Sequence, residues 1–213
     1  SGTTLRNAQT WNCFYGVAAD SATVYVENVL IYQGTYGLST SSGGGVIHGI
    51  NLSINSSQNA VFSYVSSTFN LTNSLFVGVS QMGSVTGTFN GAYNATNSSA
   101  ASVFQTVGAG IHYLAANSPY RNTGTTTINA QLLADLKTRT TYPPTVIASN
   151  TTTWGDSTLG PAVQRDTDTP DLGYHYTPID WAISSLTVGA NQRLILTNGA
   201  SVTMYGTYGL RLN

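Results

Sequence analysis

Charged side chains are scarce in this chain of 213 residues: they make up 7% of the sequence, against about 25% in a typical globular domain. There is one lysine, Lys137, and the formal net charge is −1. A nucleic-acid-binding face and a surface that binds anionic lipids by charge both need clustered basic residues. The composition therefore excludes nucleic acid as a partner and excludes charge-driven binding to membranes.

Cysteine and long apolar runs are almost absent. The single cysteine, Cys13, excludes an intramolecular disulfide and a cysteine-based zinc site. No apolar run is long enough to span a bilayer, so we expect no membrane insertion. No charged-then-apolar leader opens the chain, so we expect any export signal to have been removed or to lie outside these residues.

Four asparagines recur at near-constant gaps of 21, 23 and 22 residues, and they are Asn7, Asn28, Asn51 and Asn73. Asparagine adopts the left-handed backbone conformation at a bend more readily than other non-glycine residues. Apolar residues occupy most positions two and four before each asparagine, in the set Leu5, Val24, Val26, Ile47, Phe69 and Leu71. A repeat near 22 residues with an alternation of period two predicts an all-β fold, a parallel β-helix with about 22 residues per rung, in which the asparagines stack as a ladder.

The alternative architecture is an antiparallel sandwich with regular turns. Hairpins of a sandwich favour Asn-Gly or Asp-Gly between their strands, and the first 82 residues contain neither pair. The coil is therefore the favoured architecture for the β-helix rungs that we place at 1–82.

The regular register breaks in the second part of the chain. Residues 83–181 predict an inserted side lobe, in which 90–102 form a loop and 129–139 form one short helix. Asn129 is well placed to cap that helix, and the leucines that follow share one face. Residues 182–213 return to strand patterns, so we expect them to rejoin the β-helix.

Two segments resemble elements of secreted bacterial right-handed parallel β-helix repeat proteins. Residues 117–124, Asn-Ser-Pro-Tyr-Arg-Asn-Thr-Gly, are similar to their SPaiDaG element, and residues 170–176, Pro-Asp-Leu-Gly-Tyr-His-Tyr, are similar to their DiGAyEy element. The resemblance implies a right-handed coil, a secreted, extracellular or cell-surface location, and a structural or adhesive role. The chain departs from the family pattern at Arg121-Asn122, where the family has Ile-Asp, and at Tyr174-His175-Tyr176, where it has Ala-Tyr-Glu. Two acidic positions are thus lost, so the resemblance implies no carboxylate site.

The richest polar cluster contains Asp166, Asp168 and Asp171, with His175 close behind. Carboxylates at these spacings are able to gather Ca²⁺, which takes six to eight oxygen ligands. The alternative is a turn in which Asp171 accepts backbone N–H groups. The glycine that follows the third acid in calcium-binding loops is missing, so the turn is the favoured interpretation, and we expect no other cofactor.

The 13 tyrosines suggest a different kind of site. Tyr32 with Tyr36, and Tyr174 with Tyr176, have spacings that suit the faces of strands, and exposed rings there would stack on a sugar. The alternative is that these rings are half-buried within strands, where tyrosine is common.

Two functions follow from these patterns. The first is an extracellular structural or adhesive module, whose open coil ends stack on another copy, or on an adjacent segment of a longer chain, to form a fibre. The alternative is a carbohydrate-binding or polysaccharide-cleaving protein, with polysaccharide as its partner. Cleavage on this fold needs matched carboxylates on one face, and residues 1–82 contain only Asp20 and Glu27. We therefore assign no catalytic residue.

Overall fold

The computed structural model describes residues 2–84, 86–108 and 110–213, without the side chains of 84 and 149–153. The chain divides into two compact units. Unit 1 contains the residues up to Val103, Asn117–Lys137 and Asp166–His175, and unit 2 contains Phe104–Ala116, Thr138–Arg165 and Tyr176–Asn213.

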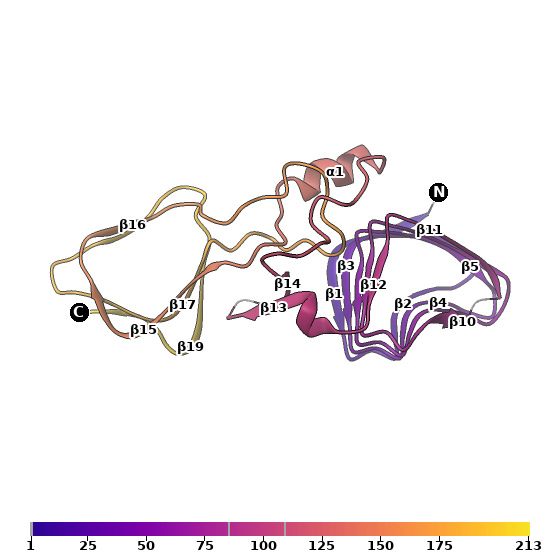
Figure 1. The fold of residues 1–213 in the computed structure, drawn as a ribbon, viewed down its shortest axis with the longest axis horizontal. Helices are drawn as coiled ribbons and strands as arrows, with labels where there is room; N and C mark the ends of the chain where they lie inside the picture. The colour runs from indigo at the N-terminus through magenta and orange to yellow at the C-terminus, as the bar shows by residue number, and fades with distance from the viewer. Residues whose placement is uncertain (1, 85, 109) are drawn as a thin grey trace. The chain divides into compact units, whose positions relative to one another are not determined.

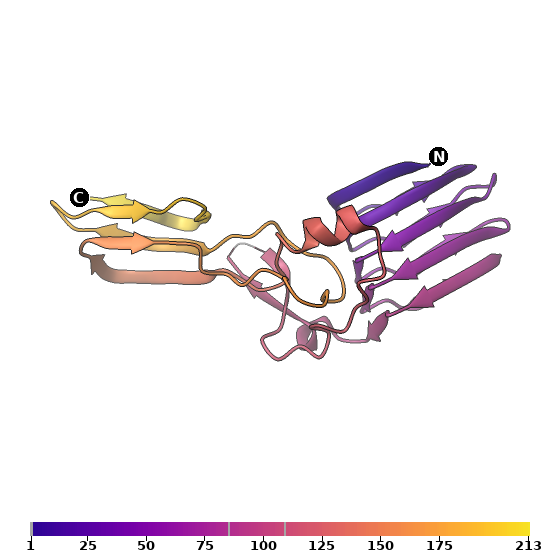
Figure 2. The same ribbon diagram turned by 90° about the horizontal axis from the view of Figure 1, so that it is seen from above.

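Unit 1 is a parallel β-helix in which each coil contributes strands to two sheets. The strands of the first sheet are β1 (Thr3–Trp11), β3 (Ala22–Tyr32), β5 (Gly45–Ile50), β6 (Ser53–Asn55), β8 (Ser67–Thr72), β9 (Leu75–Val77), β11 (Gly87–Ala92) and β12 (Ala95–Asn97). Those of the second sheet are β2 (Tyr15–Ala19), β4 (Tyr36–Thr40), β7 (Asn59–Ser63) and β10 (Gln81–Ser84). Figure 1 looks along this stack, so that its coils overlie one another, and Figure 2 shows the strands of the first sheet side by side in chain order.

The register of the strands follows the sequence repeat. Ile47 pairs with Val24 on one side and with Phe69 on the other, and Phe69 pairs with Phe89 in the next coil. The prediction of an all-β parallel β-helix with about 22 residues per coil is confirmed. Because neighbouring parallel strands share backbone hydrogen bonds, each coil positions the next one.

The interior of unit 1 is apolar and receives side chains from both sheets. Leu38, Ile47 and Phe69 are each 0% exposed, and burial of one such side chain stabilises the fold by roughly 1.5–3 kcal/mol. Gly49 interrupts the inward apolar column because a Cβ there would lie 2.6 Å from a methyl carbon of Leu52. Leu52 of the same coil and Leu71 of the next coil fill the space that this glycine leaves.

The coil extends further than the sequence predicts. In place of the loop expected at 90–102 and the break of register after 82, β11 and β12 pair in parallel with β8 and β9, and a short 3₁₀ helix, η1 (Ala100–Ser102), follows. Every residue of β11 is exposed. Backbone hydrogen bonds to β8 therefore hold this strand in place. Because the strand buries no apolar side chains, its sequence shows no pattern of inward apolar residues.

The region predicted as one lobe at 83–181 contains several distinct pieces. β13 (Phe104–Val107) and β14 (Gly110–Leu114) form an antiparallel pair. Parallel coils of unit 2 are formed by β15 (Thr145–Trp154), β16 (Ser157–Leu159), β17 (Trp181–Val188), β18 (Leu194–Leu196) and β19 (Val202–Leu212). These coils begin at Thr145 and not at 182, because Ile147 and Leu159 share one apolar core with Ile183 and Leu186.

The helix α1 (Ala130–Leu136) is shorter than the predicted span 129–139. Asn129 caps it as expected, since its Oδ1 accepts the backbone N–H groups of Gln131 at 2.9 Å and Leu132 at 3.1 Å. The helical turns end at Leu136, and Lys137 is the C-cap. Within the described part of the chain, neither α1 nor any other helix has the length and hydropathy of a membrane span.

Candidate functional site

The four repeated asparagines lie at the same bend of successive coils, with left-handed backbone angles. The angle φ is 58° at Asn7, 52° at Asn28, 54° at Asn51 and 52° at Asn73. At the corresponding bend of the fifth coil Tyr93 has a φ of 53°. Asn28 Nδ2 donates to Asn7 Oδ1 at 2.9 Å, and Asn73 Nδ2 donates to Asn51 Oδ1 at 3.4 Å. These side chains therefore bond to one another along the stack.

The same amides also hold segments that are remote in the sequence. Asn28 Oδ1 accepts the N–H of His175 at 2.7 Å, and its Nδ2 donates to the His175 carbonyl at 2.9 Å. Asn73 makes the same pair of bonds to Thr125, at 2.8 Å and 2.9 Å. The side-chain amide thus forms the two hydrogen bonds, one accepted and one donated, that a peptide group of a neighbouring strand would form. The asparagines therefore act as clamps.

The clamped segments, residues 117–125 and 166–175, carry a buried ionic network. His175 Nε2 lies 2.5 Å from Asp166 Oδ2, and His175 Nδ1 lies 3.0 Å from the carbonyl of Gly173. The carbonyl only accepts, so Nδ1 carries a proton, and an ionised carboxylate accepts from Nε2. The side chains are 0% and 2% exposed, so the pair of His175 and Asp166 lies out of contact with solvent.

Asp171 connects the two clamped segments. Its Oδ1 accepts the N–H of Asn122 at 2.7 Å, its Oδ2 lies 3.2 Å from Arg121 Nη1, and its own N–H donates to Asp166 Oδ2 at 2.9 Å. Burial alone would raise the pKa of Asp166, but the hydrogen bonds and charge of His175, with the N–H of Asp171, outweigh it and lower that pKa below its usual value. The network therefore keeps the carboxylate of Asp166 ionised inside the fold.

Of the three aspartates predicted as calcium ligands, two are buried and one is exposed. Asp166 and Asp171 face the donors described above, and Asp168 is exposed. Among the residues that the structure describes, no group of three His, Cys, Asp or Glu side chains has the arrangement of a metal site. The bond from the N–H of Asn122 to Asp171 joins residues 49 positions apart, so it does not belong to the local turn that the sequence predicts.

Unit 2 contains a buried carboxylate, Asp180, for which the sequence gives no signal. Asp180 Oδ1 accepts the N–H groups of Ala162 at 2.8 Å and Val163 at 3.0 Å and lies 2.8 Å from Arg165 Nη1. Its Oδ2 accepts the N–H of Ser201 at 2.9 Å. Although burial opposes ionisation, Arg165 and the backbone donors lower the pKa of Asp180 far below the usual carboxyl range. This carboxylate holds two turns against the start of β17.

The four tyrosines predicted as sugar contacts lie in different environments. Tyr174 and Tyr176 are only 7% and 8% exposed, so their rings are not available to a ligand. The ring of Tyr32 packs against Trp11 with centroids 5.4 Å apart. Tyr36 is half-buried and belongs to a larger group of aromatic residues.

This aromatic cluster lies on the second sheet of unit 1 and consists of Phe14, Tyr15, Tyr36, Phe62 and Tyr64. The ring of Tyr36 stacks on Tyr15 at 5.5 Å and on Phe62 at 4.3 Å between centroids. Phe14 meets Tyr15 edge-on at 4.7 Å, and Tyr64 meets Phe62 edge-on at 4.7 Å. Phe14 and Tyr64 are each 58% exposed, so the cluster presents apolar rings to solvent.

Comparison with protein-family models, with curated proteins and with solved structures finds no match to this chain. Its function is therefore inferred from three features of the molecule, which are the coil edges, the clamped segments and the aromatic cluster.

Proposed function

We propose that this chain is an extracellular structural and adhesive module of a bacterial surface or fibre, and that it extends by stacking coil on coil. The observation that carries the proposal is the edge of β1. This strand pairs with β3 from Thr3 to Trp11, and no other described strand pairs with it. Its second edge therefore presents N–H and C=O groups that another parallel strand is able to bond.

A complementary edge is present on β11, which pairs with β8 and with no other described strand. Because the paired strands of unit 1 are all parallel, β11 of one copy matches the direction of β1 in the next copy. A contact between two different surfaces does not close on itself and generates a filament. The partner that this geometry fits is a second copy of the chain or an adjacent segment of a longer chain.

The use of charge in the fold supports the same proposal. Buried or half-buried ion pairs among the described residues include Arg6 with Glu27, Arg121 with Asp171, Arg165 with Asp180, and His175 with Asp166. Four of the eight acids and three of the seven lysines and arginines take part in these pairs, so few charges remain to repel a second copy. The extracellular setting rests on the resemblance of residues 117–124 and 170–176 to secreted β-helix proteins.

A lysine on the β1 edge should interrupt the stacking. Wild-type protein is expected to form longer rods as its concentration rises, whereas Thr4→Lys places a charge on an exposed residue of β1 and should weaken association by at least about tenfold. Sedimentation velocity over a range of concentrations, with electron microscopy of the same samples, measures the effect.

Gln58→Lys is the matched control, because it adds the same charge at an exposed position of the third coil, away from β1. It should leave the association unchanged. Wild-type protein that stays monomeric at every concentration, or equal weakening by the two lysine variants, would count against stacking through β1.

A further inference from the structure

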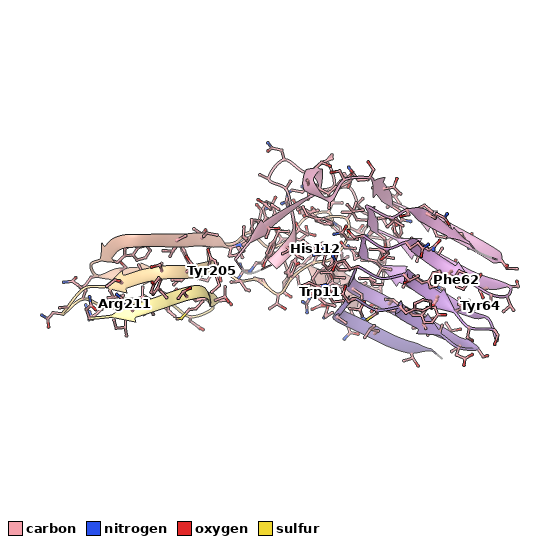
Figure 3. The ribbon with its side chains drawn as sticks, turned by 90° about the horizontal axis from the view of Figure 1, so that it is seen from below. Trp11, Phe62, Tyr64, His112, Tyr205 and Arg211 are labelled. Carbon is pink, nitrogen blue, oxygen red and sulfur yellow. The ribbon has the colours of Figure 1, made fainter. Side chains whose placement is uncertain are left out.

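A cleft of about 380 Å³ lies beside the aromatic cluster on the second sheet of unit 1. It is lined by Tyr15, Tyr64 and Ala18 and by the hydroxyl-bearing residues Ser39, Thr40, Ser41 and Ser42. The hydroxyls of Tyr15 and Tyr64 lie 3.3 Å apart, within hydrogen-bonding distance. Figure 3 shows Tyr64 next to Phe62, which supports its ring. The volume lies within the range of small-ligand sites, roughly 300–1,000 Å³.

Hydrogen-bonding groups lie close to these rings. The hydroxyl of Ser41 donates to the carboxylate of Asp20 and accepts the N–H of Gly43 at 3.2 Å. Asp20 is exposed, so its carboxylate keeps further acceptor sites that face solvent. Aromatic faces, hydroxyl groups and a carboxylate are therefore available at one small cleft.

We propose that this cleft binds a neutral sugar unit of a polysaccharide. A pyranose ring has C–H bonds on its faces and hydroxyl groups around its rim. The C–H face packs on a tyrosine ring, and the rim hydroxyls bond to serine hydroxyls and to Asp20. This inference rests on the proposed function and identifies a ligand for its adhesive part. The sugar site does not depend on the β1 edge.

The charges around the cleft select against other ligands. None of the lining residues is charged, and the neighbouring Asp20 is negative, so it would repel the carboxylate or sulfate of an acidic sugar. A purely apolar ligand would displace water from the exposed carboxylate of Asp20 and give it no partner in return, which is unfavourable. A neutral, hydroxyl-rich ring satisfies both conditions.

The rings are positioned before any ligand arrives. Tyr36 supports Tyr15 from one side and Phe62 supports Tyr64, so the contacts within the aromatic cluster restrict both tyrosines. The hydrogen bond with Tyr64 raises the pKa of Tyr15, so the Tyr15 hydroxyl stays protonated at neutral pH. Groups that are already ordered lose less conformational freedom on binding.

Calorimetric titration of the full chain tests the site. The probes are neutral hexasaccharides of glucose, mannose, galactose and xylose, with polygalacturonate as the acidic comparison. At least one neutral probe is expected to bind, and Tyr64→Ala is expected to weaken that binding by at least about tenfold. Tyr64→Phe keeps the ring and removes the hydroxyl, so it should fold as the wild type does and lose less affinity.

Trp11→Ala is the matched control, because Trp11 is 62% exposed on the same unit and does not line the cleft. Figure 3 places it apart from Phe62 and Tyr64. Its affinity for the sugar should equal that of the wild type. Failure of every neutral probe to bind, binding of the acidic probe alone, or unchanged affinity of Tyr64→Ala would overturn the proposal.

The two proposals fail separately. Rods in the sedimentation experiment without sugar binding would remove the sugar site and leave the stacking function. Sugar binding by a chain that stays monomeric would retain the site and remove the stacking.

Discussion

Replacing Asp166 with alanine is expected to lower the free energy of unfolding by about 3–5 kcal/mol, because removal of one partner leaves a buried charge without its counterion. His175 loses its carboxylate partner at 2.5 Å, and the N–H of Asp171 loses its acceptor. The segment 166–175 is then held against the coil mainly by the asparagine clamps. Urea unfolding of the full chain, followed by circular dichroism, measures the change.

Asp20→Ala is the matched control for Asp166→Ala, since it removes an exposed carboxylate from the same unit and should change stability by less than about 1 kcal/mol. The lowered pKa of Asp166 also sets the pH dependence. Its stabilising effect is complete above the pKa of the unfolded chain and is lost as pH falls toward the lower folded value. Asp166→Ala should therefore lose less stability on acidification than the wild type. Equal destabilisation by both alanine variants would contradict a buried network that holds the fold.

Asn28→Ala is expected to lower the free energy of unfolding by about 4 kcal/mol, from three lost hydrogen bonds of about 1 kcal/mol each and about 1 kcal/mol of strain of alanine at left-handed φ. The lost bonds join Asn28 to Asn7 and to both backbone groups of His175. The amide of His175 should also exchange its hydrogen faster. Urea unfolding gives the first quantity, and hydrogen exchange monitored by NMR gives the second.

Two further variants separate the sources of this effect. Asn28→Gly removes the same bonds but tolerates the φ of 52°, so it should be more stable than Asn28→Ala by about 1 kcal/mol. Asn90→Ala removes an exposed asparagine amide that makes one bond, to Asn70 at 2.7 Å, and should cost less than about 1 kcal/mol. If Asn28→Ala were no more damaging than Asn90→Ala, the clamp would have no energetic role.

The coil itself could be predicted because a bend with left-handed backbone angles favours asparagine, and Asn7, Asn28, Asn51 and Asn73 mark it four times. The fifth bend was missed because Tyr93 occupies it, and tyrosine carries no preference that a sequence pattern would reveal. The inward apolar columns of the first four coils could be predicted because apolar residues recur two and four positions before the asparagines. They could not be predicted for β11, whose residues are all exposed.

The clamps and the buried network could not be predicted, because they join residues separated by 147 positions, as in Asn28 and His175. No local sequence pattern indicates which remote backbone groups the side chain of an asparagine at the bend will bond. Arg121 and His175, two residues at which the chain departs from the family elements, are the ones that meet Asp171 and Asp166. The resemblance shows only the acids lost at Asn122 and Tyr176 and does not predict that Arg121 and His175 pair with acids.

The aromatic cluster was missed for a different reason. The predicted tyrosine pairs rest on short spacings that suit the faces of strands, and two of those four rings are buried. The useful spacing was the coil repeat, since Tyr15 and Tyr36 are 21 residues apart, the same gap as between Asn7 and Asn28. Residues one repeat apart stack across neighbouring strands, and this signal was present in the sequence.

Disulfide trapping tests most directly the central claim that successive strands run parallel in the register of the repeat. Val46 in β5 pairs with Thr68 in β8, and paired positions in neighbouring strands lie within the Cα separation that a disulfide spans, about 4.4–6.8 Å. In a Cys13→Ser background, Val46→Cys combined with Thr68→Cys is expected to oxidise readily to a cross-linked monomer. Val46→Cys combined with Asn70→Cys, two residues out of register, should stay reduced. Ready cross-linking of the shifted pair and none of the aligned pair would contradict the parallel stack.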